Sequence, residues 1–312
     1  MSRKDIKDFL KRVNQFKIDE DINIIKLIEN LQNTGFNAKR LALACKIYKD
    51  MIRDKECVKF FGLAGAMVPV GMQGIIHDFI EEGFIDILVT TGANLTHDIA
   101  ETLGYHHLQG ELNIDEINDI NLHEEELNRI YDVFLPNQVY EGIEDFVAKL
   151  DIPDVNMPVS SFLKYLGSQL PENSKSILKI CSKKNIPIFC PAFTDSGLAL
   201  QLGFHNQNLN LNHFKDMLGM VNLAWDAKKA GVCFVGGGTP KNFIMQSLQF
   251  CPTSAKYAIQ ITMDRPEPGG LSGATLHEAI SWGKVNKEAK YTTLISDATI
   301  ALPLIFWYLK QV

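Results

Sequence analysis

The feature that most constrains the fold of this 312-residue chain is a repeated alternation of short apolar runs with helical segments. Six runs have the length and composition of buried strands, and each lies near a segment with helical spacing of its apolar residues. They are VKFFGLA (58–64), IDILVTTG (85–92), IPIFCPAFTD (186–195), VCFVGGG (232–238), YAIQITMD (257–264) and YTTLISD (291–297). This order predicts an α/β fold with a Rossmann-like, doubly wound, mostly parallel sheet and helices on both faces.

The residues before the first strand have a different pattern. Apolar side chains recur at helical spacing over 3–32 and again over 35–53. We therefore expect an N-terminal helical extension over residues 1–55 and an α/β domain over 56–312. A more polar stretch at 105–170 predicts a surface excursion that includes an acidic helix.

Charge and composition exclude several classes of protein. The net charge of −6 argues against a duplex nucleic-acid binder, which needs a basic surface. No apolar run approaches the roughly 18 residues of a membrane span, and the charged N-terminus does not resemble a signal peptide. The six cysteines form no CxxC pair and no zinc-ligand pattern. We expect a cytoplasmic protein with reduced, buried thiols and no metal site.

Candidate ligand-binding segments follow four of the predicted strands. In doubly wound sheets, ligands bind beyond the carboxyl ends of the strands. Small, glycine-bearing or acidic residues stand there in TTGAN (90–94), FTDSG (193–197), GGGTPKN (236–242) and SDAT (296–299). Backbone N–H groups at a helix start after a glycine turn can bind phosphate, and two such turns fit a dinucleotide. The alternative is a pair of tight turns beneath packed helices, with Asp297 as an ordinary N-cap.

The segment SGATLHEAISWGK (272–284) carries the strongest signal for covalent chemistry. An amine must be uncharged to attack an imine or carbonyl carbon, and burial beside apolar rings favours that form of lysine. Trp282 can supply such a wall for Lys284, or can stack on a cationic substrate. Glu278 can attract a substrate ammonium. The alternative is a solvated glutamate followed by a surface lysine after a turn.

These segments, together with CPAFTDSGL (190–198), VTTGANLTHD (89–98) and ISDATIALPL (295–304), resemble the deoxyhypusine synthase family over about residues 57–312. The resemblance implies a Rossmann-like fold, usually assembled as a homotetramer with active sites shared between paired subunits. It also implies that NAD takes a hydride from spermidine. An aminobutyl group then passes, as an imine on a lysine of the enzyme, to a lysine of a hypusine-type translation factor.

The resemblance assigns roles to particular residues. Lys284 matches the catalytic lysine, while Glu278 and Trp282 match residues that hold the polyamine, and we place Asn242 with them. The positions that match NAD contacts are Thr91, Gly92, Ala93, Asp195, Gly237, Gly238, Asp297 and Ala298.

Some positions depart from the family pattern on the substrate side. Asn242 stands where well-studied members have a histidine that assists hydride and proton chemistry, and an amide cannot act as a base near neutral pH. Leu200 and Leu271 stand in place of two polyamine-binding aspartates. His205 and His277 are candidates to replace the missing histidine, although a single histidine is more often structural.

Other departures affect the cofactor side. His97 replaces a glutamate that contacts the ribose of NAD, and Ala66 and Pro69 replace an asparagine and a serine of the cofactor loop. An amphipathic helix over 3–17 would either cover the active-site entrance of another subunit, as in the family, or pack on its own domain.

Three functions remain open at this stage. The first is aminobutyl transfer to a protein lysine, and the second is transfer to a small amine such as putrescine, which gives homospermidine. The third is a non-catalytic protein that binds NAD or a polyamine. The presence of Lys284 together with Trp282 and Glu278 argues against the third.

Overall fold

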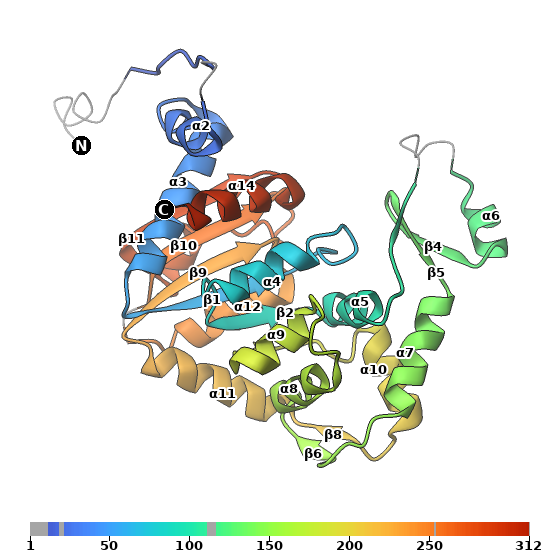
Figure 1. The fold of residues 1–312 in the computed structure, drawn as a ribbon. Helices are drawn as coiled ribbons and strands as arrows, with labels where there is room; N and C mark the ends of the chain where they lie inside the picture. Colours follow the sequence, from blue (N-terminus) through green and yellow to red (C-terminus); the bar gives the residue numbers. More distant parts are fainter. Residues whose placement is uncertain (1–11, 19–21, 111–116, 253, 312) are drawn as a thin grey trace.

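The fold is built on a six-stranded parallel sheet. The computed structural model describes residues 12–18, 22–110, 117–252 and 254–311. The strands lie in the order β11 (Val285–Ile295), β10 (Ala255–Thr262), β9 (Lys229–Val235), β1 (Cys57–Leu63), β2 (Ile87–Thr90) and β7 (Ile188–Phe189) (Figure 1). All five pairings are parallel. Counted along the chain, the strand order is 3-2-1-4-5-6, which is the Rossmann order, so the predicted fold is confirmed.

The helices connect the strands and flank the sheet (Figure 1). They are α2 (Ile24–Leu31), α3 (Phe36–Arg53), α4 (Gln73–Glu81), α5 (Gly92–Thr102), α6 (Asp119–Glu124), α7 (Gln138–Ala148), α8 (Val159–Gln169), α9 (Ile177–Lys184), α10 (Gly197–His205), α11 (His213–Asp226), α12 (Gly238–Leu248), α13 (Glu278–Ser281) and α14 (Ala298–Lys310).

The two faces of the sheet bury two separate hydrophobic clusters. Adjacent residues of β1 point to opposite faces, as the period of a strand requires: Phe61 joins one cluster and Phe60 the other. The Phe61 cluster includes buried side chains of α3, α4, α9 and α14. The Phe60 cluster includes buried side chains of α11, α12 and α13. The six cysteines are free and buried, as predicted.

The N-terminal helices differ from the prediction. The expected helix over 3–32 is wrong in its middle, because residues 12–18 have no helical structure and α2 begins only at Ile24. Val13 is 55% exposed, and short helices without a packing partner are marginally stable in water. Residues 3–11 of the helix expected over 3–17 lie outside the described part of the chain. The helix predicted over 35–53 is confirmed as α3.

Helix α3 is packed on the sheet and contributes to its core. Its side chains Ala44, Cys45, Tyr48 and Met51 are almost fully buried in the cluster that contains Phe61. The domain boundary between residues 55 and 56 stays a prediction. Residues on both sides of it, in α3 and in β1, pack in the same hydrophobic cluster.

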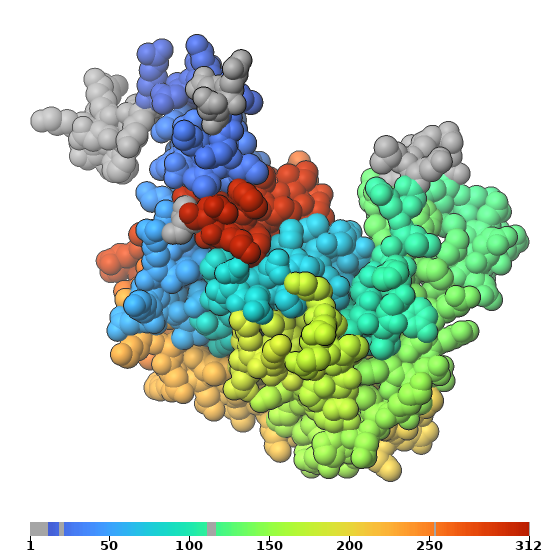
Figure 2. Space-filling view, viewed as in Figure 1, coloured from blue at the N-terminus to red at the C-terminus, as the bar shows by residue number. Residues whose placement is uncertain are grey.

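The polar middle of the chain forms an arm rather than a simple acidic helix. After the short helix α6, β4 (Leu127–Ile130) pairs with β5 (Val133–Pro136), which also pairs with β3 (Leu108–Gln109). A second small sheet joins β6 (Asn156–Met157) and β8 (Asn210–Leu211). Figure 2 shows that the arm stands away from the body that carries α14, with a hollow between them.

None of the described helices combines the length and the apolar character needed to cross a bilayer.

Candidate functional site

A pocket of about 320 Å³ lies between α12 and the segment that leads into β11. Four of the predicted residues meet in it, namely Lys284, Glu278, Trp282 and Asn242. The complete lining, here called the lysine pocket, consists of Lys241, Asn242, Met245, Gln246, Gln249, Leu271, Ala274, Thr275, Glu278, Ala279, Trp282 and Lys284. Among these described lining residues, Glu278 is the one acidic side chain, and Lys241 and Lys284 are the two basic ones.

A hydrogen-bonded turn fixes the backbone of Lys284. Gly283 has φ of +69°, a conformation that L side chains rarely adopt, so this position favours glycine. The N–H of Lys284 donates to the carbonyl of Ala279 (3.1 Å), and the Lys284 carbonyl accepts from Ala255 N–H at the start of β10 (3.1 Å). The Trp282 carbonyl accepts a bond from the side chain of Gln249, the residue directly after α12 (3.3 Å). The turn therefore delivers both side chains to the pocket from a fixed backbone.

Lys284 and Trp282 are paired inside this pocket. The Lys284 ammonium lies over the Trp282 ring, 5.1 Å from its centre, within the range of a cation–π contact. Lys284 is half-buried, whereas Trp282 is 60% exposed. The tryptophan therefore offers only a partial apolar wall and leaves ring surface available to a ligand.

The structure separates the two leucines that replace aspartates. Leu271 lines the lysine pocket, but Leu200 lies on α10, is 57% exposed and is absent from the lining. Within one chain, the altered position at Leu271 is therefore the one that removes negative charge from the pocket.

Neither candidate replacement histidine lines the lysine pocket. His205 bonds Glu144 of α7 (3.1 Å), and His277 bonds the hydroxyl of Tyr291 (2.9 Å). Both histidines are bonded outside the pocket. Asn242, which stands at the position of the family histidine, does line it.

The glycine turn after β9, residues Gly236–Gly238, lies at the point where the strand order reverses between β1 and β9. Gly236 and Gly238 have φ of +69° and +55°. A Cβ on Gly237 would lie 2.4 Å from Ser272 Cα, whereas a Cβ on Gly238 would have no neighbour within 4 Å. Gly237 is thus required for packing, and Gly238 leaves open space beside the helix start. A helix start that follows a glycine turn can bind a phosphate group.

The turn after β2 has a similar division of roles. Thr91 N-caps α5, so the helix begins at Gly92. A Cβ on Gly92 would lie 2.5 Å from Ser196 Cβ, while Ala93 is exposed. Asn94 instead holds the loop after β1: its side chain accepts from Val68 N–H (3.2 Å) and donates to the Gly65 carbonyl (3.0 Å).

The remaining predicted cofactor residues lie at the same edge of the sheet. Asp297 N-caps α14 by accepting from Thr299 N–H (2.8 Å), and Ala298 is the first residue of that helix. Asp195 is exposed in the loop after β7. Parallel topology places all these segments beyond the carboxyl ends of their strands. They do not line the lysine pocket, which begins one helical turn further along α12.

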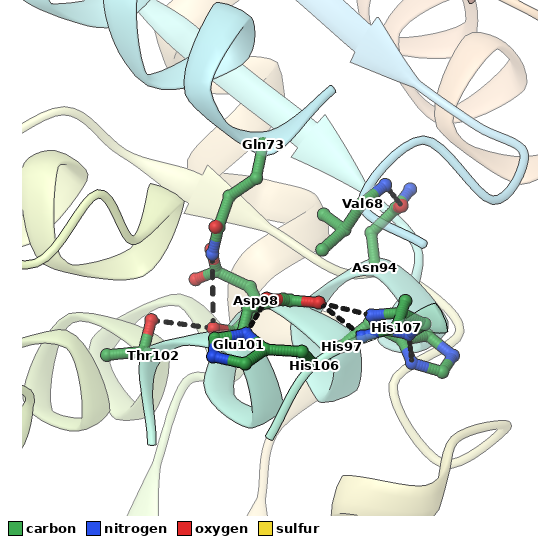
Figure 3. Close-up of polar contacts among 9 residues, drawn as sticks. All are labelled: Val68, Gln73, Asn94, His97, Asp98, Glu101, Thr102, His106 and His107. Carbon is green, nitrogen blue, oxygen red and sulfur yellow. Dashed lines mark hydrogen bonds and ion pairs between the residues drawn. The ribbon is translucent and has the colours of Figure 1, made fainter. Parts of the chain in front are cut away.

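His97 belongs to a histidine–carboxylate network on α5 (Figure 3). Glu101 accepts from His107 through both the backbone N–H (2.8 Å) and Nδ1 (2.5 Å), and from His106 Nδ1 (2.9 Å). His107 Nε2 lies 2.9 Å from His97 Nδ1. Burial, and then the charge on His107, lower the pKa of His97 to about 4.

The charge on His107 decides which nitrogen of a neutral His97 carries the proton. When His107 is neutral, its Nδ1–H donates to Glu101 and its Nε2 accepts from His97 Nδ1–H, which leaves His97 Nε2 as an acceptor. When His107 is charged, its Nε2–H donates to His97 Nδ1, and His97 then has its N–H donor at Nε2.

Comparison with known proteins agrees with this geometry. The family model for deoxyhypusine synthase matches residues 26–309. The chain belongs to the deoxyhypusine synthase family. The match begins before residue 57, where the resemblance was expected to start, and includes α2 and α3. Family membership identifies the protein as an enzyme, a transferase.

Relatives of the deoxyhypusine synthase family match nearly the whole chain. "Probable deoxyhypusine synthase 1" of Methanosarcina acetivorans is 45% identical over 96% of this chain and 94% of its own length. The protein of the same name from Archaeoglobus fulgidus is 41% identical over 96% of this chain and 97% of its own length. A crystal structure of a candidate deoxyhypusine synthase from Entamoeba histolytica has a TM-score of 0.67 at 19% identity, covering 96% of this chain and 97% of its own. This last likeness supports the fold alone.

Sequence reasoning missed Lys241, a second lysine in the same pocket. It is 5% exposed, and burial together with the charge on Lys284 lowers its pKa to about 8, against the opposing effect of Glu278. The only hint in the sequence was its place directly before Asn242 in GGGTPKN.

Proposed function

We propose that this transferase moves an aminobutyl group from spermidine, or a related polyamine, through an imine on Lys284 to a lysine of a hypusine-type translation factor. The observation that supports it is that the Lys284 side chain shares one pocket with Trp282, Glu278 and Asn242, with its Nζ atom 5.1 Å from the centre of the Trp282 ring. We also propose the role of each of these residues in the reaction.

The residues of the pocket have separate tasks in this reaction. The Glu278 carboxylate and the Trp282 ring attract an ammonium of the polyamine. Lys284, in its uncharged form, attacks the carbon of the oxidised substrate; the new C–N bond replaces the one to the departing diamine, which takes the proton that the lysine nitrogen loses. The Asn242 amide orients the polyamine by hydrogen bonding, because an amide cannot accept a proton from an amine.

We propose NAD as the hydride carrier, and when bound it would accept the hydride from the amine carbon. Gly237, Gly238, Thr91, Gly92 and Ala93 would hold it at the carboxyl edge of the sheet. The Rossmann strand order and the open side of Gly238 support this assignment. Asp195, Asp297 and Ala298 are proposed as further contacts on the same edge.

Assembly as a homotetramer is supported by an exposed apolar face of α11. Phe214 (76% exposed), Met217, Leu218 and Trp225 (61% exposed) project from this helix, which packs beside α12. An apolar helix face of this kind marks a contact surface. Light scattering should report a smaller particle for Leu218→Glu than for Phe36→Glu, a change at an exposed phenylalanine outside α11.

The proposed chemistry is tested by incubating the protein with spermidine and NAD⁺, reducing with borohydride and mapping the adduct by mass spectrometry. We expect an aminobutyl mass on Lys284 and release of 1,3-diaminopropane. Lys284→Ala and Lys284→Arg should both abolish the adduct, since arginine stays protonated and forms no imine. Diaminopropane release at an equal rate by Lys284→Ala would rule out the imine at this residue.

The acceptor needs a second assay. Labelled spermidine is supplied with putrescine and the candidate translation factor in one reaction. Label on a protein lysine supports the proposed function, whereas label in a small polyamine alone supports the homospermidine alternative.

A further inference from the structure

Lys241 is a buried lysine whose three donors are matched by three neutral oxygens. Its ammonium donates to Gln260 Oε1 (3.1 Å), to the Leu271 carbonyl (3.1 Å) and to the Ala274 carbonyl. An ammonium has three N–H donors, so these acceptors use all of them. A buried charge is costly unless it is fully hydrogen-bonded, and no carboxylate is among its hydrogen-bond partners in the described part of the chain.

Gln260 extends this contact to the glycine turn. It lies on β10, is fully buried, and its amide donates to the carbonyls of Gly236 (3.1 Å) and Ser272 (2.8 Å). Lys241 and Gln260 together therefore bind residues 271–274, here called the pocket wall, to both β10 and the turn after β9.

A third contact joins the wall directly to the start of α12. The N–H of Gly238 donates to Ser272 Oγ (3.1 Å). Gly237 approaches Ser272 so closely that an added Cβ would lie 2.4 Å from its Cα. The wall thus carries Leu271 and Ala274 toward the lysine pocket and Ser272 toward the glycine turn.

From these contacts we infer that Lys241 is a positioning residue, which together with Gln260 locks the pocket wall to the glycine turn. A ligand bound at the turn would then shift the wall residues that line the lysine pocket. This inference rests on the proposed function, because the ligand at the turn is NAD. The lock would fix the position of NAD at the turn after β9 relative to the polyamine amine in the lysine pocket.

The experiment uses Trp282, which lines the lysine pocket, as a fluorescent reporter. Trp225→Phe and Trp307→Phe leave it as the only tryptophan of the chain. NAD⁺ is titrated into this protein and into its Lys241→Met derivative, with binding measured separately by calorimetry. We expect NAD⁺ to change Trp282 emission in the first protein. In Lys241→Met we expect the Kd for NAD⁺ to stay within roughly threefold, a difference below about 1 kcal/mol, while most of the Trp282 emission change is lost.

Matched variants separate the lock from a general loss of packing. Lys179 is also a buried lysine, but it lies on α9 and pairs with Glu172 (2.8 Å), so Lys179→Met should keep the full emission change. If Lys241→Met does not melt cooperatively, Ser272→Ala decides the question, because it removes the bond to Gly238 from the other side of the joint. Its emission change should fall as well.

The outcomes distinguish the inference from the function on which it rests. Calorimetry that detects no NAD⁺ binding to the unsubstituted protein overturns the proposed cofactor and the inference together. If NAD⁺ binds and the emission change is as large in Lys241→Met as in the reporter protein, the lock is wrong and the proposed function stands.

Discussion

The ammonium of Lys284 lies 5.1 Å from the centre of the Trp282 ring, although a left-handed glycine separates the two residues. Gly283 turns the chain so that both side chains enter one pocket. A cation–π contact of this kind contributes about 0.5–2 kcal/mol. We expect Trp282→Ala to raise the KM for spermidine roughly tenfold, and Trp282→Phe to recover part of the loss. An unchanged KM in Trp282→Ala would show that the ring does not contact the polyamine.

Removing the negative charge of Glu278 should weaken polyamine binding. Glu278→Gln keeps the size of the side chain but replaces a charged hydrogen bond, worth about 1.5–3 kcal/mol, by a neutral one. The KM for spermidine should rise about tenfold or more, with little change in melting temperature because Glu278 is exposed. Steady-state kinetics with Glu267→Gln, another exposed glutamate outside the pocket lining, provide the control.

Two neighbouring glycines should respond differently to alanine. A Cβ on Gly237 meets the backbone of Ser272, which cannot move without shifting the pocket wall, whereas a Cβ on Gly238 meets nothing within 4 Å. Gly237→Ala should lower both stability and activity. In the protein without a ligand, Gly238→Ala adds only the strain of its left-handed backbone, about 1 kcal/mol. Thermal melts of both variants without NAD⁺ check this order of stability, and equal melting temperatures would contradict it.

Asp98 should be a stability residue rather than a catalytic one. It is fully buried, and its carboxylate accepts from Gln73 Nε2 (2.7 Å), Ser176 Oγ (2.7 Å) and the N–H groups of Ile177 (2.8 Å) and Leu178 (3.0 Å). Figure 3 shows its bond to Gln73.

Asp98→Ala would leave the donors of Ser176, Ile177 and Leu178 without this acceptor, at a cost of about 3 kcal/mol or more, while Gln73 keeps its bond to the backbone carbonyl of residue 98. Denaturant unfolding should show the loss. The KM of the folded variant for spermidine should equal that of the unsubstituted protein, because Asp98 does not line the lysine pocket.

The histidine network should make stability depend on pH between about 4 and 6.5. The pKa of His97 is lowered from 6.5 to about 4, so between these values the unfolded chain binds a proton that the folded chain does not. Stability must then fall as the pH falls through this window. The charged groups that face His97 are His107 and, beyond it, Glu101.

His97→Gln removes this proton and should flatten the pH dependence of unfolding over the same window. The effect is at most about 3 kcal/mol between its two ends. His205→Gln, at an exposed histidine, is the control. A slope that stays the same in His97→Gln would mean that other groups dominate the acid sensitivity.

The sequence alone determined the elements whose signal is local. The six apolar runs predicted the six sheet strands, because each is long enough to cross a buried layer. The key residues Glu278, Trp282 and Lys284 lie within seven positions of one another, so their proximity follows from a single turn. The N-terminal residues 12–18 were misjudged, since helical spacing gives a stable helix only where the apolar stripe has a surface to cover.

Tertiary structure decided which distant residues share the pocket. Helix α12 lies against the segment 271–284, which brings Asn242 and the unpredicted Lys241 to Lys284, while Leu200 on α10 is left outside. The strand order places the glycine turn of β9 beside β1, a contact between residues more than 150 positions apart. Such contacts depend on how whole faces pack, and the residue spacing along one segment carries no information about them.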